Sequence, residues 1–380
     1  MNKEYILYIG GFELPDKNAA AHRVLSNAKA LRDSGKNVIL VGINKDLPKG
    51  TKMIDTYVKI SEFDTYAIPY PSGMASWAKN IVDIKPYIEL CQKYGTISTI
   101  ICYNFPAIAL DKLRRYCFKN SINCIADVTE WYSVEGRNIV VKIVKGMDVW
   151  YRMRIVHKKL DGLLVISRFL ENYYRNCKNN LYIPALVDTQ EEKWKANYEK
   201  SDSVLKLVYA GSPGYKDRID VLIEALRFVK RNYILDIIGI TKEQYLSMYP
   251  QHKAFLKASS SINFHGRLKH LDTLQYVKKA NYSCFFRMND RMCEAGFPTK
   301  FVESITCGTP VITNKVSNLD EYMKENENGV LLKKIDSRKI AELIERIDFT
   351  MSVNRKLFDY SNFQQEIQKF LIVISKRKGR

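Results

Sequence analysis

The chain has 380 residues, of which 46% are hydrophobic, and it carries a formal net charge of +19. This length is sufficient for two domains of common size, and the apolar content excludes an intrinsically disordered chain. The charge is spread along the chain without a zinc-finger, basic-zipper or RNA-binding signature, so we expect no nucleic-acid partner. A phosphate-bearing small molecule or an anionic membrane surface fits the positive charge better.

The cysteine pattern and the hydropathy favour a cytoplasmic protein. The eight cysteines form no C-x-x-C pair, which argues against a zinc ribbon and against thioredoxin-like chemistry. The first apolar run is too short for a signal peptide, and no run of about 18 apolar residues predicts a transmembrane helix. We therefore expect a cytoplasmic location, with peripheral contact at the inner face of the plasma membrane as an option.

The first elements predict the opening of a doubly wound α/β domain. A strand, a glycine turn, a helix and a second strand are predicted at residues 5–9, 10–11, 19–33 and 37–41. Asn18 precedes the predicted helix, where its side chain can cap the first turn. No G-x-G-x-x-G sequence is present, so the turn is not a dinucleotide-binding fingerprint.

Two acids and an aromatic residue lie at the end of a predicted strand over residues 123–128. They are Asp127, Glu130 and Trp131. Open parallel sheets bind ligands at the carboxyl ends of their strands, so Asp127 or Glu130 is a candidate to orient an attacking hydroxyl. Trp131 is a candidate to stack on a sugar face. The alternative is that Asp127 caps the following segment and the aromatic ring belongs to the core.

Two further segments bear on the organisation of the chain. Residues 138–159 mix large apolar side chains with Lys and Arg, which predicts either an interfacial amphipathic segment or a basic-faced helix packed on the sheet. Residues 188–203 are polar and lack apolar periodicity, so they predict an interdomain linker. We therefore expect an N-terminal domain over residues 1–190 and a C-terminal domain over residues 191–380.

The second domain is predicted to open with a strand over residues 204–210, a glycine-containing loop and an amphipathic helix over residues 220–229. Gly211 frees the backbone of the loop, and Lys216 and Arg218 stand just before the N-terminus of the helix. Backbone N–H groups and cations at such a position can grip a diphosphate. The alternative is an ordinary turn with a solvated lysine.

Residues 281–314 predict a further strand–loop–helix–strand unit. Its parts are predicted at residues 282–286, 287–298, 300–307 and 309–313. The start of the helix is a natural anion site, formed by Phe297, Pro298, Thr299 and Lys300. Glu303 on this helix can accept hydrogen bonds from vicinal hydroxyls, such as those of a ribose. The alternative is a plain crossover whose Glu is solvated.

The run of Glu303, Ser304, Gly308, Thr309, Pro310 and Val311 resembles the second half of the motif of the family 4 retaining glycosyltransferases, which have the GT-B fold. That motif has a first Glu eight residues before the second. Here Ala295 holds that position and Glu294 stands one residue earlier, so either an insertion restores the pair or the first acid is absent. Lys216 matches the basic residue of the family's glycine-rich loop, while Ser212 stands where the family often has Arg.

The resemblance implies a fold class of α/β type, with two Rossmann-like doubly wound parallel-sheet domains facing across a cleft. The N-terminal domain would bind the acceptor and the C-terminal domain the nucleotide-sugar, and the last helix can pack back on the N-terminal domain. It also implies catalytic roles for Lys216 and Glu294, and Asp127, at its strand end, is the third catalytic candidate. The donor contacts that it adds are Gly10, Gly11, Gly211, Ser212 and Arg267.

The implied reaction moves a hexosyl unit from a nucleotide-diphosphate sugar to a saccharide or lipid-linked acceptor of a growing surface glycan, with retention. There is no Asp-x-Asp to hold a divalent ion and no zinc-type histidine pair, so no metal and no further cofactor are expected. The diphosphate charge would then be met by Lys216, Arg218 and Lys300. Two alternatives remain, a sugar-nucleotide epimerase on the same plan and a basic nucleic-acid-binding or scaffold protein.

Overall fold

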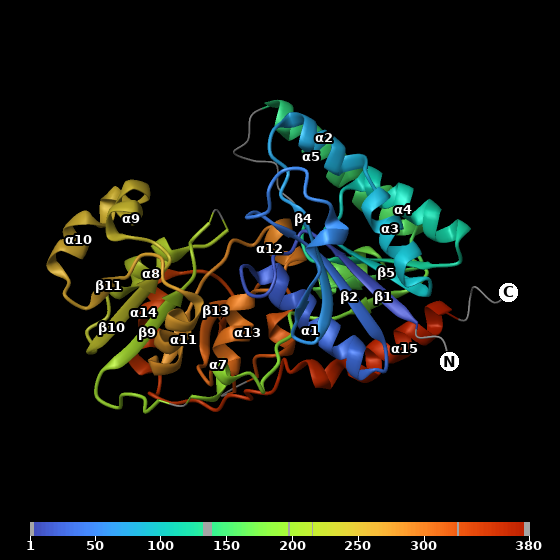
Figure 1. Ribbon diagram of the computed structural model, residues 1–380. Coiled ribbons are helices and arrows are strands. Elements are labelled where there is room, and N and C mark those ends of the chain that lie inside the picture. Colours follow the sequence, from blue (N-terminus) through green and yellow to red (C-terminus); the bar gives the residue numbers. More distant parts are fainter. Residues whose placement is uncertain (1–3, 132–138, 197, 215, 325–326, 376–380) are drawn as a thin grey trace. The chain divides into compact units, whose positions relative to one another are not determined.

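The computed structural model describes residues 4–131, 139–196, 198–214, 216–324 and 327–375 (Figure 1). The chain divides into two compact units. The first is formed by Met1–Val187 with Asp359–Arg380, and the second by Asp188–Phe358. Each unit has its own sheet covered by helices, which is the α/β class that the sequence predicts.

The sheet of the first unit has eight strands in the described part of the chain. They are β1 (Tyr5–Gly10), β2 (Asn37–Asn44), β3 (Val58–Ile60), β4 (Phe63–Pro69), β5 (Ile97–Tyr103), β6 (Asn123–Val128), β7 (Gly162–Val165) and β8 (Asn180–Tyr182). Their order is β3-β4-β2-β1-β5-β6-β7-β8, and β3 alone among these strands is antiparallel to its neighbour. The central strands are almost wholly apolar because both faces of a parallel sheet are covered.

Helices cover both faces of this sheet. Helices α1 (Ala19–Asp33) and α15 (Gln364–Ser375) pack together and share a core cluster with the sheet, so the last helix belongs to the first unit. Gly162 makes this packing possible, because a Cβ atom there would lie 2.6 Å from the Phe370 ring. On the other face, α4 (Ala107–Lys119) contacts α2 (Met74–Val82) and α5 (Ile139–Tyr151). Helices α3 (Lys85–Tyr94) and α6 (Arg168–Tyr173) complete the first unit.

The predicted start of the first unit is confirmed. Helix α1 has the predicted bounds, and the side chain of Asn18 accepts a hydrogen bond from the Ala21 N–H at 2.9 Å. The sequence analysis made no prediction for the region that forms β3, β4, α2 and α3. The segment predicted over residues 138–159 begins at a residue outside the described part, and from residue 139 it forms α5 followed by a π-helical turn over Arg152–Val156.

The second unit has a parallel sheet with six strands among the residues that the structure describes. Its strands are β9 (Leu205–Ala210), β10 (Tyr233–Ile238), β11 (Ile262–Phe264), β12 (Tyr282–Cys284), β13 (Val311–Asn314) and β14 (Gly329–Leu332), in the order β11-β10-β9-β12-β13-β14. Its helices are α7 (Glu192–Lys195), α8 (Ile219–Leu226), α9 (Lys242–Met248), α10 (Lys253–Ala258), α11 (His270–Lys279), α12 (Arg291–Ala295), α13 (Thr299–Thr306) and α14 (Ser337–Arg346).

The boundary between the two units falls at the start of the predicted linker, but two details of the second unit differ from the sequence prediction. The predicted linker contains α7, because Trp194 is buried to 2% exposure within this unit and orders the residues around it. The predicted loop over residues 287–298 contains α12, whose N-cap is Asp290, with a side chain that accepts a hydrogen bond from the Cys293 N–H. No helix among the described residues is long and apolar enough to cross a lipid bilayer.

Candidate functional site

The site in the second unit is built on the loop that follows β9, where two glycines allow a close approach of chain segments. Gly211 has a φ of +121°, and a Cβ atom there would lie 2.8 Å from Cε of Lys300. Gly239 follows β10 with a φ of +109°, and a Cβ atom there would lie 2.4 Å from the Gly211 carbonyl carbon. Only glycine fits at either position. The Lys300 side chain therefore reaches the end of β9.

Lys300 lies in the first turn of α13, and its side chain is only 14% exposed. Its Nζ donates to the Tyr209 hydroxyl at 2.7 Å and to Oδ1 of Asp217 at 3.2 Å, and it lies 4.1 Å from the centre of the Tyr209 ring. Burial lowers the pKa of Lys300 to about 8, although the neighbouring Asp217 carboxylate acts in the opposite direction. The ammonium is thus largely removed from water.

Arg287 supplies a second buried cation that the sequence analysis did not identify. It follows β12, is 6% exposed, and its Nε lies 3.7 Å from Oδ1 of Asp217. This Nε has no hydrogen-bond partner among the described residues. Its backbone is held on both sides by Asn314, which accepts from the Arg287 N–H at 2.8 Å and donates to the Arg287 carbonyl at 3.0 Å.

Backbone hydrogen bonds join the loop after β9 to the segment after β12. The Arg218 N–H donates to the Phe286 carbonyl at 2.8 Å, and the Met288 N–H donates to the Lys216 carbonyl at 3.0 Å. This short antiparallel pairing places Lys216 and Asp217 beside Arg287. Because the two segments lie at the carboxyl ends of adjacent parallel strands, the contact falls at the edge where α/β sheets bind ligands.

The balance of charge at this edge is positive. Asp217 is 5% exposed, and the two cations Lys300 and Arg287 share its carboxylate. Burial raises the pKa of Asp217, but Lys300 and Arg287 outweigh that effect and lower it overall, so this carboxylate stays ionised. Lys216 is half-buried and near enough that its charge further lowers the pKa of Lys300. Buried charges are normally paired, so the surplus positive charge favours an anionic ligand. We call Lys216, Asp217, Arg287 and Lys300 the cation cluster.

Glu303 lies one turn after Lys300 on α13 and is accessible. Its side chain is 30% exposed, and its Oε1 lies 3.3 Å from Nε2 of His270, the first residue of α11. Residues three apart share a face of a helix, so Lys300 and Glu303 present a cation and an acceptor on the same side. The sequence predicted Glu303 but not its neighbour His270.

The start of α13 offers fewer donors than predicted. The Phe297 ring is buried against Tyr322 and Phe358, so its side chain belongs to the core. Pro298 has no N–H and caps the helix, and its carbonyl accepts from the Phe301 N–H. The first-turn N–H groups of Thr299 and Lys300 are those that remain for an anion at this helix end.

The other predicted residues of the second unit lie as follows. The Arg218 guanidinium is paired with Asp220, with Nη2 at 2.8 Å from Oδ2, so part of its charge is already neutralised. Ser212 and Arg267 are exposed. Glu294 on α12 is half-buried and accepts from the Ser317 N–H at 3.1 Å, and burial raises its pKa.

The structure places Asp127 away from the role that was predicted for it. Its side chain has no exposed surface and forms a two-pronged pair with the Arg23 guanidinium, with contacts of 2.7 and 3.0 Å. The Tyr8 hydroxyl donates to its other oxygen. The engagement of both oxygens in the interior argues against a role in orienting an acceptor or in capping the next segment. The local sequence gave no sign of Arg23, which lies 104 residues away.

The remaining predictions in the first unit also concern strand ends. Gly10 has a φ of +152°, and a Cβ atom there would lie 2.2 Å from the Tyr103 carbonyl oxygen, so packing against β5 is enough to require glycine. Gly11 is exposed with open space around it. Glu130 is exposed, and Trp131 is half-buried with its ring against Tyr173 at 5.0 Å.

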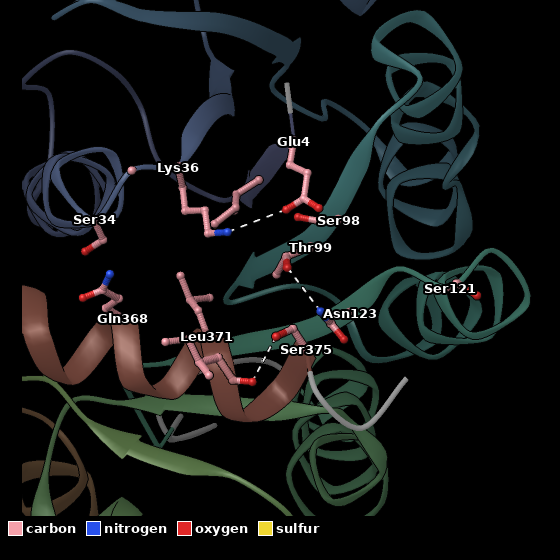
Figure 2. A pocket seen from close by; sticks show the side chains of 13 residues that line it. Glu4, Ser34, Lys36, Ser98, Thr99, Ser121, Asn123, Gln368, Leu371 and Ser375 are labelled. Atoms are coloured by element: carbon pink, nitrogen blue, oxygen red, sulfur yellow. Dashed lines mark hydrogen bonds and ion pairs between the residues drawn. The ribbon is translucent and has the colours of Figure 1, made fainter. Parts of the chain in front are cut away.

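A cavity of about 320 Å³ lies at the amino ends of the strands of the first sheet, opposite to the carboxyl ends that carry the predicted acceptor residues (Figure 2). Residues near the amino ends of β1, β5 and β6 line it together with α15, including Ile6, Thr99, Asn123 and Leu371. The Asn123 amide donates to the Thr99 hydroxyl at 3.5 Å at its wall. Because ligands of α/β sheets bind at the carboxyl ends of strands, this cavity is separate from the predicted acceptor position.

Comparison with known proteins agrees with these features. Residues 190–348 match the family model described as glycosyl transferases group 1. An uncharacterized glycosyltransferase of Methanocaldococcus jannaschii is 27% identical over 207 residues, which cover 52% of this chain and 54% of that protein. The match thus spans about half the length of that curated relative.

Two solved structures are similar over nearly the whole chain. Sucrose-phosphate synthase from Thermosynechococcus elongatus has a TM-score of 0.68 at 16% identity, covering 99% of this chain and 98% of that one. HepE of Anabaena in complex with UDP and glucose has a TM-score of 0.63 at 14% identity, covering 97% and 99%. These structures show that the chain has a GT-B-like fold, and the match over residues 190–348 shows that this part of the chain is similar to the group 1 glycosyltransferases.

Proposed function

We propose that this protein transfers a hexosyl unit from a nucleotide-diphosphate sugar to a hydroxyl of a growing surface glycan or a lipid-linked saccharide, with retention at the anomeric carbon. The observation that carries the proposal is the cation cluster, in which two buried cations share one carboxylate beside a glycine loop at the carboxyl ends of β9 and β12. A nucleoside diphosphate supplies the anion that this site lacks. The bound UDP of the similar HepE structure is consistent with that ligand class.

Each member of the site has a distinct role in this proposal. Lys300 and Arg287 bind the diphosphate from the protein side, and Lys216 reaches it from the loop after β9. As the glycosidic bond breaks, negative charge grows on the departing phosphate, and fixed cations in a nearly dry site stabilise that charge strongly. Glu303 accepts hydrogen bonds from vicinal hydroxyls of the donor.

The proposed reaction takes place on one face of the sugar. The bond between the anomeric carbon and the phosphate oxygen breaks, and the acceptor oxygen forms its bond to the same face. The acceptor proton passes to the departing phosphate, so no protein nucleophile is required. We propose that fixed cations balance the diphosphate charge without a divalent metal, because the chain has no Asp-x-Asp and holds its own cation cluster.

The acceptor side is proposed on less specific ground. With Asp127 engaged inside the first unit, Glu130 and Trp131 at the end of β6 remain the candidates for acceptor contact. The cytoplasmic location, with peripheral membrane contact, belongs to the same proposal. The sugar, the base and the acceptor class are to be found by experiment.

The alternative of a sugar-nucleotide epimerase gains one supporting observation. His270 and Glu303 are two titratable groups 3.3 Å apart, which is the kind of pair that acid–base chemistry on a sugar carbon needs. An epimerase would change the donor sugar without an acceptor and without releasing free nucleotide. A transferase would release nucleoside diphosphate.

The test is a panel of UDP-, GDP- and ADP-sugars incubated with the full chain, with mass spectrometry of nucleotide and sugar products. We expect one sugar nucleotide to yield free diphosphate and a sugar with unchanged anomeric configuration, equally with and without EDTA. Glu303→Ala is expected to lose most donor binding, and Lys216→Ala to lose turnover. Activity abolished by EDTA and restored by magnesium would contradict the metal-free part, and wild-type rates in both variants would contradict the site.

A further inference from the structure

Helix α2 is apolar in sequence, yet none of its residues is buried. Met74 is 91% exposed and Trp77 is 43% exposed, and the Trp77 ring contacts Tyr70, which is itself 40% exposed, at 5.7 Å. A helix of nine residues is only marginally stable in water unless an apolar face packs against something. The outward face of α2 is therefore a candidate for burial in a partner.

Helix α5 presents a second exposed apolar stripe. Ile139, Ile143, Met147 and Trp150 are each more than half exposed, and they recur at intervals of three or four residues on one side of the helix. Val149, which points elsewhere, is buried at 7% exposure. These exposed residues of α5 thus form an apolar stripe along the helix.

The two helices belong to the same layer of the first unit. Both contact α4, on the face of the sheet opposite to α1 and α15, and Figure 1 shows them in the same region of this unit. We call their exposed apolar residues the α2–α5 surface. Its members are Tyr70, Met74, Trp77, Val82, Ile139, Ile143, Val144, Met147 and Trp150.

The charge around this surface is strongly positive. Over residues 74–85 and 139–159 the sequence has eight Lys and Arg, of which Arg152 is buried, and two acids, Asp83 and Asp148. Both acids are already paired, Asp83 with Lys79 at 3.8 Å and Asp148 with Arg152 at 3.6 Å. Lys85 and Lys142 are exposed beside the apolar residues.

We propose that the α2–α5 surface docks the protein onto an anionic lipid bilayer. Apolar side chains, including two Trp, would enter the headgroup region, while the surrounding lysines contact acidic headgroups. A second copy of this chain is a poorer occupant, because the same basic surface would then face itself in a protein of net charge +19. The inference rests on the membrane contact of the proposed function, to which it assigns a surface, and it does not depend on which sugar is transferred.

The test is flotation of the full chain with vesicles of phosphatidylcholine alone or of phosphatidylcholine mixed with phosphatidylglycerol. We expect binding to the anionic vesicles that weakens with salt. The double variant Trp77→Gln with Trp150→Gln is expected to bind at least about tenfold more weakly, since the lipid contact then loses two indole rings. Lys85→Gln with Lys142→Gln is expected to remove most of the salt-dependent part.

The matched control is Leu271→Gln with Val373→Gln, which removes two apolar residues of similar exposure from α11 and α15. This control is expected to bind like the wild type. The thermal midpoint of each variant and its release of nucleotide with a water-soluble acceptor show that the fold and the reaction are intact. Vesicle binding without any sugar-nucleotide activity would leave this inference standing while contradicting the proposed function.

Three results would overturn the inference. They are failure of the wild type to bind anionic vesicles, equal binding by the Trp double variant, and a dimer that this variant abolishes while vesicles are ignored. The last result would assign the α2–α5 surface to a second copy of the chain. Analytical ultracentrifugation without lipid detects it.

Discussion

At the residue scale, the most informative side chain is Lys300. It is an ammonium held almost out of water, with one phenol and one shared carboxylate as its partners. Such a group binds an anion more strongly than a surface lysine does, because little water screens the interaction. Its cost is that burial also favours the neutral amine, which makes the charge sensitive to pH.

This sensitivity gives a prediction for donor binding. The pKa of Lys300 is lowered to about 8, so the free protein loses this positive charge as the pH rises through that value. We expect the affinity for UDP, or for the nucleotide that the panel selects, to be constant below about pH 7 and to fall above about pH 8. Isothermal titration calorimetry across this range measures it.

Two variants separate the charge from the packing. Lys300→Met keeps much of the side-chain volume and is expected to weaken nucleotide binding by about tenfold or more, with loss of the pH dependence. Lys300→Arg keeps the charge at all these pH values and is expected to shift the decline to higher pH. An unchanged pH profile in Lys300→Met would show that another group titrates.

At the element scale, the loop between β9 and α8 depends on two glycines and on its pairing with the segment after β12. The positive φ at Gly211 and its distance of 2.8 Å to Lys300 make this glycine a packing requirement as well as a backbone one. The backbone pairing with residues 286–288 then fixes where Lys216 and Asp217 stand. The site is therefore a property of adjacent strands and not of one loop.

Gly211→Ala tests this dependence. We expect it to lower the free energy of unfolding by about 1–3 kcal/mol, because of the positive φ. We also expect it to weaken nucleotide binding, because the added methyl group displaces the Lys300 side chain. Gly50→Ala is the matched control, since Gly50 also has a positive φ, of +85°, but has open space around it. Urea unfolding and nucleotide titration of both variants give the comparison. Equal effects on binding would mean that backbone strain alone is responsible.

At the scale of the whole molecule, each unit is held by long-range polar contacts in addition to its core. In the first unit, Arg23 on α1 pairs with Asp127 on β6 and donates to the Ile183 and Pro184 carbonyls at 3.1 and 2.9 Å. This single guanidinium joins a helix, a central strand and the segment after the last strand. Burial raises the pKa of the neighbouring Tyr8 and the Asp127 charge raises it further, while the Arg23 charge acts in the opposite direction.

We expect Asp127→Asn to destabilise the first unit by about 3–5 kcal/mol, because it leaves the Arg23 charge buried without its counterion. The double variant Arg23→Met with Asp127→Leu is expected to lose less, since it leaves no unpaired charge. Urea unfolding monitored by tyrosine and tryptophan fluorescence measures both. A fully stable Asp127→Asn protein that lacks transferase activity would instead support the catalytic role that the structure argues against.

Whether a functional residue could be predicted from the sequence depended on whether its local sequence context was informative. Lys216, Lys300 and Glu303 stand next to glycine turns or helix starts, so their local context was sufficient to nominate them. Arg287 was missed although it directly follows a buried strand, a position that could have identified it. Helix α2 was missed although its apolar residues recur at helical intervals, and the structure leaves none of its residues buried.

The sequence by itself indicated many of the strands and helices, the glycine turns and the resemblance to a family, because apolar periodicity, glycine turns and helix capping act over a few residues. Only the tertiary structure decided which charges meet, since that depends on which strands become neighbours in the sheet. Asp127 and Arg23 are 104 residues apart, and Lys300 and Asp217 are 83 apart. Asp127 and Arg23 are buried and paired, so they are structural. The cation cluster keeps a surplus of positive charge, because desolvation favours complete pairing in the interior and leaves a surplus only where a ligand can balance it.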